Sequence, residues 1–249
     1  MARRKKDMPT TATLRPFYRA GCRGQLTDAG RKTEAEAIRD TLSRNHDGKF
    51  GFRIYRVNYE SDADFSRFVD VLTAHANFAL DEHDTGDEIR HLLTWDIQDS
   101  EAELSGASTD QVRDLFKQWV DSVGGNRGST RYAHCIYADA ESINSVLTGD
   151  QPAERFLRSI LHPTAFVKII DGPWEAGVEQ LGPEDFDNEE QMRKHNEGDE
   201  GYDPVEGCRK YEVGWMKVAA CMVVTRAYQM MIDNGWHAYY VRPPAIQSN

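Results

Sequence analysis

The sequence predicts an α+β protein in which a mainly antiparallel sheet of five or six strands carries helices on one face, with a ferredoxin-like centre. Hydrophobic residues form 39% of the 249 residues, which is enough for a packed core. Short segments rich in β-branched and aromatic residues alternate with segments of helical periodicity. The order strand–helix–strand occurs twice, at about residues 50–98 and 131–170, which predicts a repeated β-α-β core.

Helices are expected where a capping residue precedes apolar residues spaced three and four positions apart. Thr33 with Glu36 and Ser108 with Gln111 have the spacing of a capping box, in which each side chain satisfies a backbone N–H group. The expected helices cover residues 33–44, 61–80, 108–123, 139–147 and 152–161.

Strands are expected in short segments of β-branched and aromatic residues bounded by turn residues. They cover residues 50–59, 92–97, 131–138, 165–170 and 236–242. Pro243 and Pro244 prevent the last strand from continuing. Before it, the apolar residues 213–232 predict a helix buried on most sides, although the start of this stretch, near Tyr211 to Lys217, has the alternative of a strand.

The chain is expected to hold one main domain with additions at its N-terminal end. Residues 1–13 are charged and aperiodic, which predicts a disordered basic tail. Residues 14–48 form an N-terminal helical appendage, and residues 49–249 form a single α+β domain. Within that domain, residues 172–206 are predicted to be a long acidic loop, because they offer few apolar side chains to bury.

The net charge of −11 is unevenly distributed. Residues 1–49 hold twelve Lys and Arg against six Asp and Glu, whereas residues 171–206 hold two against thirteen. An acidic body repels the phosphates of nucleic acid, so we expect no nucleic acid partner. No stretch approaches the ~20 apolar residues that a membrane helix needs, so we expect no membrane partner either.

The expected location is cytoplasmic. The N-terminus lacks the apolar run of a secretory signal, and the spacing of Cys22, Cys135, Cys208 and Cys221 favours free thiols in a reducing compartment. A solvated tail is the commoner role of a short basic run, but a localisation signal is the alternative, which leaves a nuclear location open. That run consists of Arg3, Arg4, Lys5 and Lys6.

The chain contains no sequence motif of a catalytic or cofactor site. It lacks a Gly-x-Ser-x-Gly elbow, a P-loop and a dinucleotide fingerprint, so catalytic residues stay unknown and no cofactor is expected. Residues 83–91 offer several His, Asp and Glu side chains, but their spacing fits no zinc pattern, and we expect no metal site.

Polar and aromatic side chains on the expected strands are the candidate pocket residues. If one face of the sheet were uncovered, they would supply aromatic walls and a few polar anchors for a small molecule. Ordinary alternation, with the polar side chains in solvent, is the simpler interpretation. The candidates are Arg53, Tyr55, Trp95, Asp96, His134, Tyr137, Tyr240 and Arg242.

These observations support two hypotheses from different classes. The first is a non-catalytic intracellular binding or interaction protein of unknown ligand, because the chain lacks a catalytic constellation and its acidic surface suits a basic partner. Its partner would be an unknown protein or small molecule, and the oligomeric state is not predicted. The alternative is a cofactor-free enzyme of the lyase, isomerase or cyclase type, for which one His or carboxylate with a shifted pKa is sufficient.

Five segments, in this order, resemble a family of uncharacterised fungal intracellular proteins. They are Phe52–Arg56, Arg131–Asp139, Phe166–Asp171, Val205–Arg209 with Val213–Val218, and Tyr240–Pro244. The resemblance spans about residues 50–244 and implies a fungal, intracellular origin. It also implies that this span is one unit, and it carries over no catalytic residue.

Overall fold

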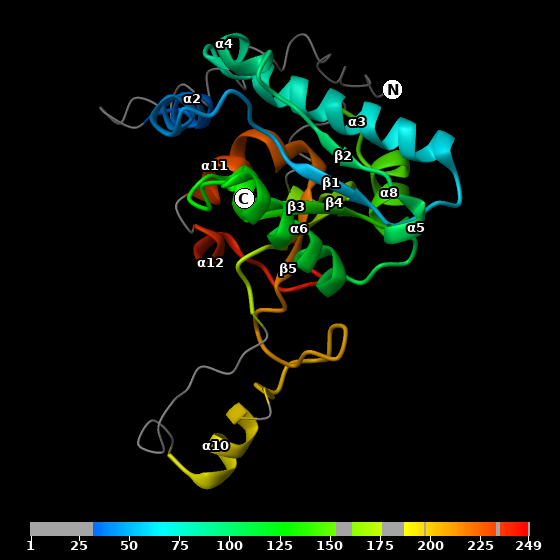
Figure 1. Ribbon diagram of the computed structural model, residues 1–249, viewed down its shortest axis with the longest axis vertical. Coiled ribbons are helices and arrows are strands. Elements are labelled where there is room, and N and C mark those ends of the chain that lie inside the picture. The colour runs from blue at the N-terminus through cyan, green and yellow to red at the C-terminus, as the bar shows by residue number, and fades with distance from the viewer. Residues whose placement is uncertain (1–31, 153–160, 176–186, 197, 233–234, 249) are drawn as a thin grey trace, which may run out of the picture.

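The computed structural model describes residues 32–152, 161–175, 187–196, 198–232 and 235–248 (Figure 1). Among these residues, six strands form one sheet in the order β2-β1-β3-β4-β5-β6. The strands are β1 (Arg53–Arg56), β2 (Asp96–Gln98), β3 (His134–Ala138), β4 (Phe166–Asp171), β5 (Trp215–Ala219) and β6 (Ile246–Gln247).

The sheet is mixed. β1 pairs in parallel with β2 and β3, and β5 pairs in parallel with β6. Within the described sheet, only β4 runs against the other strands, because it is antiparallel to both β3 and β5. The expected antiparallel majority is therefore wrong, and the ferredoxin-like repeat is not confirmed. The first strand–helix–strand unit is a crossover that keeps the strand direction, whereas the second unit reverses it.

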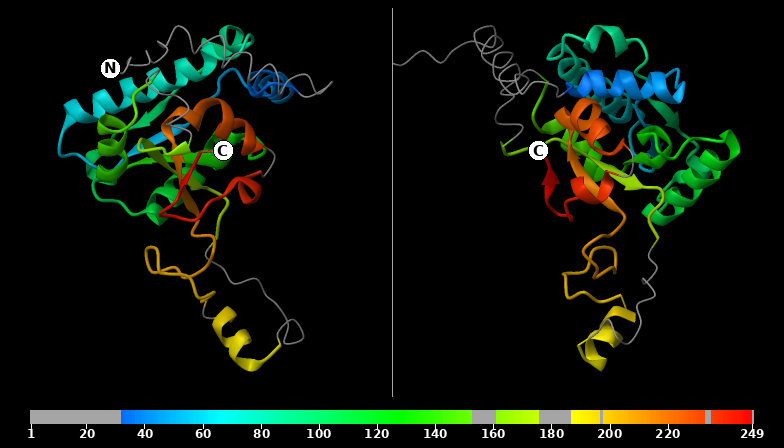
Figure 2. Two further views of the ribbon diagram at one scale, coloured as in Figure 1. Left: turned by 180° about the vertical axis from the view of Figure 1, so that it is seen from behind. Right: turned by 90° about the vertical axis from the view of Figure 1, so that its left-hand side faces the viewer.

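Helices cover both faces of the sheet, so the expectation of helices on one face is also wrong (Figure 2). The elements are α2 (Glu34–Asn45), α3 (Asp62–Asp81), α4 (Gly86–Arg90), α5 (Glu101–Leu104), α6 (Thr109–Val123), α7 (Thr130–Ala133), α8 (Ala140–Thr148), α10 (Glu189–Asn196), the 3₁₀-helix η2 (Ala220–Met222), the π-helix η3 (Val223–Ala227), α11 (Tyr228–Met230) and α12 (Trp236–Tyr239). Neighbouring residues of a strand point to opposite faces. Ile54 accordingly packs with α2, α3 and α8, and Tyr55 packs in a second cluster with α5 and α6.

The predicted helix starts at Thr33 and Ser108 are confirmed. Each hydroxyl accepts a hydrogen bond from the backbone N–H three residues later, and the side-chain oxygens of Glu36 and Gln111 accept one from the backbone N–H of the capping residue. Ala35, Ile38 and Leu42 of α2 lie in the Ile54 cluster, so the described part of the expected appendage packs on the main core, whereas residues 1–31 lie outside the described residues.

In the C-terminal half, the structure decides between two alternatives and differs from two further expectations. Of the two alternatives near Tyr211 to Lys217 the strand is correct, since β5 precedes η2 and η3. The expected strand 131–138 begins with the helical turn α7. The expected strand 236–242 is wrong, because Trp236, Tyr239 and Tyr240 are all buried and their three- and four-residue spacing suits the helical turn α12. The chain adds its last strand, β6, after that turn.

One long excursion leaves the sheet between β4 and β5. We call residues 172–214 the arm; its described residues, 172–175, 187–196 and 198–214, extend away from the body and include α10 near the far end (Figures 1 and 2). The arm includes the expected acidic loop 172–206, whereas most of the expected helix 152–161 lies outside the described residues. None of the described helices is long and apolar enough to cross a membrane.

Candidate functional site

The two ends of the arm lie side by side where it joins the sheet. The amide of Asp171, the last residue of β4, donates a hydrogen bond to the carbonyl oxygen of Gly214 at 3.0 Å. Arg113 of α6 donates from its guanidinium to the carbonyl oxygens of Asp171 and Gly214, both at 3.0 Å, and lies 4.6 Å from the ring centre of Trp174. Because Arg113 is buried, it fixes both ends of the arm to the body.

A second arginine holds the returning half of the arm. Arg242 donates to the carbonyl oxygens of Asp203 at 2.7 Å, Lys210 at 3.0 Å and Cys208 at 3.1 Å. The planar guanidinium presents several donors in a fixed fork, so one side chain fixes three backbone positions. The guanidinium carbon of Arg242 also lies 5.3 Å from the ring centre of Tyr202.

A series of aromatic rings runs from the sheet to the surface of the arm. The centre of the His134 imidazole lies 5.1 Å from the Trp236 ring, which lies 5.6 Å from the Tyr240 ring. Tyr240 contacts Tyr211 at 5.5 Å, and Tyr211 contacts Tyr202 at 5.6 Å. His134, Trp236 and Tyr240 are buried, whereas Tyr202 and Tyr211 are 42% and 43% exposed. Buried rings of the core are therefore in continuous contact with the exposed pair Tyr202 and Tyr211.

The hydroxyl of Tyr240 connects this series to the backbone of the arm. It accepts a hydrogen bond from the amide of Val213 at 3.1 Å and donates one to the carbonyl oxygen of Tyr211 at 3.1 Å. Burial is the main reason that the pKa of Tyr240 is raised to about 12. The hydroxyl therefore stays protonated and keeps donating across the physiological range.

At each end of the arm, a carboxylate lies close to a different histidine of the body. His134 Nδ1 lies 3.2 Å from the Asp171 carboxylate, and both side chains are buried. His237 Nδ1 lies 2.8 Å from the Glu212 carboxylate, and the His237 side chain is 72% exposed. The hydrogen bond to the carboxylate of Glu212 raises the pKa of His237 above its ordinary value.

Carboxylates lie in the same part of the arm as the exposed tyrosine pair. Glu200 accepts a hydrogen bond from the amide of Tyr211 at 2.8 Å, and the neighbouring Asp203 is exposed. Glu206 is also exposed and accepts a hydrogen bond from the hydroxyl of Thr109 at 2.7 Å. Residues 199–212 hold five Asp and Glu against Arg209 and Lys210, so this part of the arm has a net negative charge. We call Tyr202, Tyr211 and the carboxylates of Glu200, Asp203 and Glu206 the arm surface.

The eight candidate pocket residues do not form one set of contacts. His134, Tyr240 and Arg242 all lie where the arm meets the body; we call these three residues, together with Arg113, Asp171, Gly214 and Trp236, the arm root. Trp95 donates to the hydroxyl of Thr73 at 2.9 Å, and Tyr137 donates to the carbonyl oxygen of Ala107 at 2.7 Å. These two side chains are held separately from the root and from each other.

The remaining three candidates form a group at the start of β1 and β2. Arg53 donates to the carboxylate of Asp96 at 2.7 Å and to the hydroxyl of Tyr55 at 3.2 Å, and it lies 4.3 Å from the ring centre of Trp119. The carboxylate of Asp96 also accepts a hydrogen bond from the buried Arg131 at 3.4 Å. Two arginines share one carboxylate, which makes Asp96 structurally important.

Replacing Asp96 with Asn is expected to lower the free energy of unfolding by about 2 kcal/mol. The change leaves Arg131, which is 1% exposed, without a carboxylate, and an uncompensated buried charge is costly. Urea denaturation measures the effect. Asp121→Asn is the matched control, since Asp121 pairs with Arg127 on the surface and its loss should change little. Equal stability of the two variants would contradict the prediction.

A second ionic group lies on the sheet and was not predicted. Lys168 pairs with Asp139 at 2.5 Å and with Glu141 at 2.7 Å, and Lys217 pairs with Glu141 at 2.5 Å. Burial alone lowers the pKa of Lys168, but its hydrogen bonds to the two carboxylates outweigh that effect and raise the pKa. Each charge has a partner of opposite sign, so this group connects α8 to the sheet and needs no ligand.

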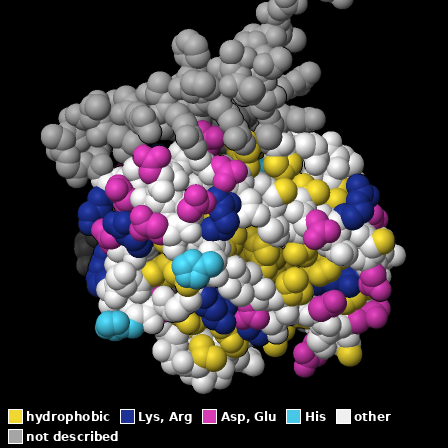
Figure 3. Space-filling model, turned by 90° about the horizontal axis from the view of Figure 1, so that it is seen from above, with side chains coloured by type: hydrophobic (Ala, Val, Ile, Leu, Met, Phe, Trp, Pro, Cys, Tyr) yellow, Lys and Arg dark blue, Asp and Glu magenta, His cyan; other side chains and the backbone are white. Residues whose placement is uncertain are grey.

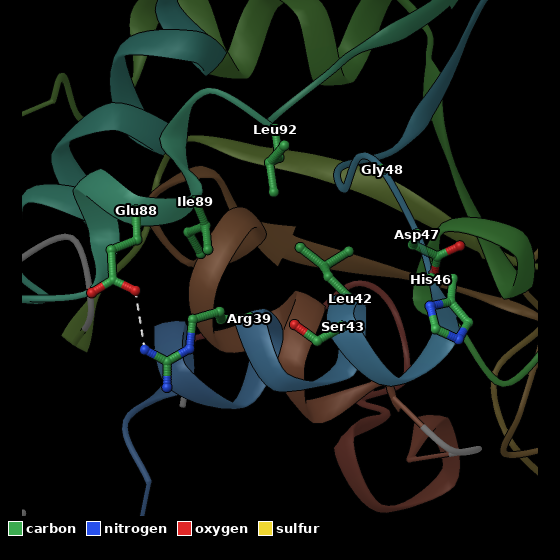
Figure 4. Close-up of a pocket in the computed structure, with 9 residues that line it drawn as sticks. All are labelled: Arg39, Leu42, Ser43, His46, Asp47, Gly48, Glu88, Ile89 and Leu92. Atoms are coloured by element: carbon green, nitrogen blue, oxygen red, sulfur yellow. Dashed lines mark hydrogen bonds and ion pairs between the residues drawn. The ribbon is translucent and has the colours of Figure 1, made fainter.

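A cavity of about 350 Å³ lies between α2 and α4, away from all eight candidates (Figure 4). Leu42, Ile89 and Leu92 form its apolar part, and Arg39 pairs with Glu88 at 3.0 Å at one side. Seen from above, hydrophobic side chains also gather on the surface between charged ones (Figure 3). Among the described residues, no three His, Cys, Asp or Glu side chains come together as metal ligands.

Sequence reasoning missed most residues of the arm root. Tyr202 and Tyr211 did carry a signal, because aromatic residues in an acidic loop have no local core to fill. No local signal marked Arg113, whose backbone partners lie 58 and 101 positions away in the chain.

The fold and the arm root define a mixed α/β protein with a supported, projecting aromatic and acidic surface. Comparisons of the chain with known protein families, curated proteins and solved structures found no match. The resemblance to the fungal family therefore remains a prediction.

Proposed function

We propose that this protein is a non-catalytic binding protein whose arm surface takes a basic protein segment. The observation that carries the proposal is the exposed tyrosine pair, Tyr202 and Tyr211, supported from the core by Tyr240 and from the side by Arg242. Tyrosine, tryptophan and arginine are the residues that most often dominate binding energy at protein interfaces.

The net negative charge of the arm favours a partner of positive charge. Residues 172–214 hold thirteen Asp and Glu against four Lys and Arg. Lysine and arginine side chains gain both from nearby carboxylates and from the faces of tyrosine rings. A partner segment that presents several of these cations therefore fits the arm surface better than a neutral or acidic segment does.

The two arginine clamps support a binding role. Backbone that is already ordered loses less conformational entropy when a partner binds. Arg242 bonds three carbonyl groups of residues 203–210, and Arg113 bonds the two residues at which the arm joins the sheet. Binding energy at the tyrosines is therefore not spent on ordering this part of the arm.

The placement of the eight candidate pocket residues favours the binding hypothesis over a cofactor-free enzyme. Acid–base chemistry requires the reacting groups to face one bound substrate. Arg53 and Asp96 bond each other at the start of β1 and β2, whereas His134 and Tyr240 lie at the arm root. The proposal includes a cytoplasmic or nuclear location, which is the location expected from the sequence.

Fluorescence anisotropy with a labelled deca-lysine peptide tests the proposal. Replacing Tyr211 with Ala should weaken binding about tenfold, which corresponds to about 1.4 kcal/mol and is typical of an interface anchor. Replacing Tyr211 with Phe should preserve affinity, because the ring supplies the contact.

Two controls make this result specific to the arm surface. Val123→Ala changes an exposed apolar side chain on α6, outside the arm, and should bind as the unchanged protein does. A deca-glutamate peptide should not bind. If Tyr211→Ala binds deca-lysine as tightly as Tyr211→Phe does, the attraction is general electrostatics and the proposal is wrong.

A further inference from the structure

The arm has two joints, which differ in their exposure to water. At the exit joint, Asp171 ends β4, and at the return joint, Glu212 precedes the residues that lead into β5. At the exit, the His134–Asp171 pair is buried, and Trp236 stacks on the imidazole at 5.1 Å. At the return, His237 is 72% exposed, and its Nδ1 lies 2.8 Å from the carboxylate of Glu212. Protons from solvent therefore reach the return pair directly.

We propose that the His237–Glu212 pair is a pH-dependent latch at the return of the arm, which orders residues 211–213 when His237 is protonated and loosens them when His237 is neutral, while the bonds of Arg242 keep residues 203–210 in place. The latch would regulate the arm surface, and that regulatory meaning rests on the proposed binding function. Its position carries the inference, because Glu212 directly follows the exposed Tyr211 and precedes the residues that lead into β5.

The charged groups around this joint allow His237 to act as the switch. Glu212 faces it directly, and the carboxylate of Asp171 adds a weaker attraction for the protonated ring. Arg113 and Arg242 bond backbone carbonyls at the same root and stay charged at every relevant pH. His237 is therefore the exposed group of this set that changes charge near neutral pH.

The sign of the effect follows from linkage. Glu212 raises the pKa of His237 in the closed joint above the ordinary value of 6.5. A raised pKa means that the closed joint binds the proton more tightly than the open joint does. The stabilisation is complete below pH 6.5 and is lost as the pH rises through the raised pKa, so the latch closes in mildly acidic solution.

The latch controls the hydrogen bonds of the Tyr240 hydroxyl, which hold Tyr211 of the arm surface in place. When Glu212 is held, the backbone on either side of it stays in place, so that Tyr240 can bond both the amide of Val213 and the carbonyl oxygen of Tyr211. Release of Glu212 loosens this backbone and lets the Tyr211 ring move away from Tyr202. We therefore expect the tyrosine pair to be best ordered at low pH.

An NMR pH titration of the free, full-length protein tests the latch. The amide signals of Tyr211, Glu212 and Val213 should titrate with the same midpoint as the ring Cε1–H of His237, above pH 6.5. The hydrogen-exchange protection of these amides, corrected for intrinsic exchange, should fall about threefold between about pH 5.5 and pH 8, as suits an exposed ion pair.

Matched variants separate the latch from general effects of pH. Glu212→Gln should move the His237 midpoint down towards 6.5 and remove the pH dependence of the three amides. His237→Gln should remove it as well, whereas His162→Gln, at an exposed histidine outside the arm, should leave it unchanged. The latch is ruled out if His237 titrates without the amides, or if the amides still titrate in His237→Gln.

These measurements use no peptide, so they are independent of the binding proposal. A working latch with no affinity for deca-lysine would leave the joint in place and reject the proposed partner. Affinity for deca-lysine without a pH-dependent joint would support the proposed partner and reject the latch.

Discussion

Replacing Arg113 with Ala is expected to lower the free energy of unfolding by about 3 kcal/mol, because a buried acceptor loses its hydrogen-bond donor. The carbonyl oxygen of Asp171 loses the bond at 3.0 Å, and Trp174 loses the guanidinium over its ring. Gly214 is less affected, since its carbonyl oxygen still accepts from the amide of Asp171. Thermal unfolding should show a midpoint about 8 °C lower for a chain of this size.

Arg127→Ala is the matched control for this variant. Arg127 pairs with Asp121 on the surface at 2.7 Å and contributes little, as exposed ion pairs usually do. Arg113→Lys should lie between Arg113→Ala and the unchanged protein, because an ammonium group keeps the charge but lacks the fork. An unchanged midpoint for Arg113→Ala would mean that Arg113 does not fix the arm root.

Replacing Gly214 with Ala is expected to have a similar cost, about 3 kcal/mol, for a different reason. Gly214 has a φ of +74°, a left-handed conformation that costs a residue with a Cβ about 1 kcal/mol. Its Cβ would also lie 2.4 Å from the Trp174 ring and 2.6 Å from the guanidinium of Arg113. Overpacking of this kind adds about 2 kcal/mol.

Gly106→Ala separates these two contributions. Gly106 has a φ of +68°, but a Cβ there would meet no atom within 4 Å. Urea denaturation should therefore show a loss of about 1 kcal/mol for Gly106→Ala, which is the backbone cost alone. If Gly214→Ala costs no more than Gly106→Ala, the close packing of Gly214, Trp174 and Arg113 is not what holds the root together.

Local signals predicted the elements that depend on neighbouring residues. The capping residues Thr33, Ser61 and Ser108 all begin helices as expected, because a cap needs only the next three residues. Trp236 and Tyr239 were assigned to a strand because short aromatic segments favour strands. Their packing on one helical face overrode that preference.

Long-range features were not predictable in the same way. Strand direction depends on where a crossover returns the chain, and the residues of β1 contain no record of whether β3 will pair in parallel. The candidate site shows the same limit. His134 and Arg242 are candidates because they are polar side chains on expected strands, but their partners Trp236 and Lys210 come from distant parts of the chain.

Chemical-shift mapping tests the binding role of the arm most directly. Deca-lysine would be titrated into the isotope-labelled, full-length protein while every assigned amide is followed. The account predicts that the largest shifts fall on residues 199–212 and on Arg242, while α2 and α4, which form the cavity, stay unchanged. Largest shifts around Leu42 and Ile89, or equal small shifts over all acidic surfaces, would contradict it.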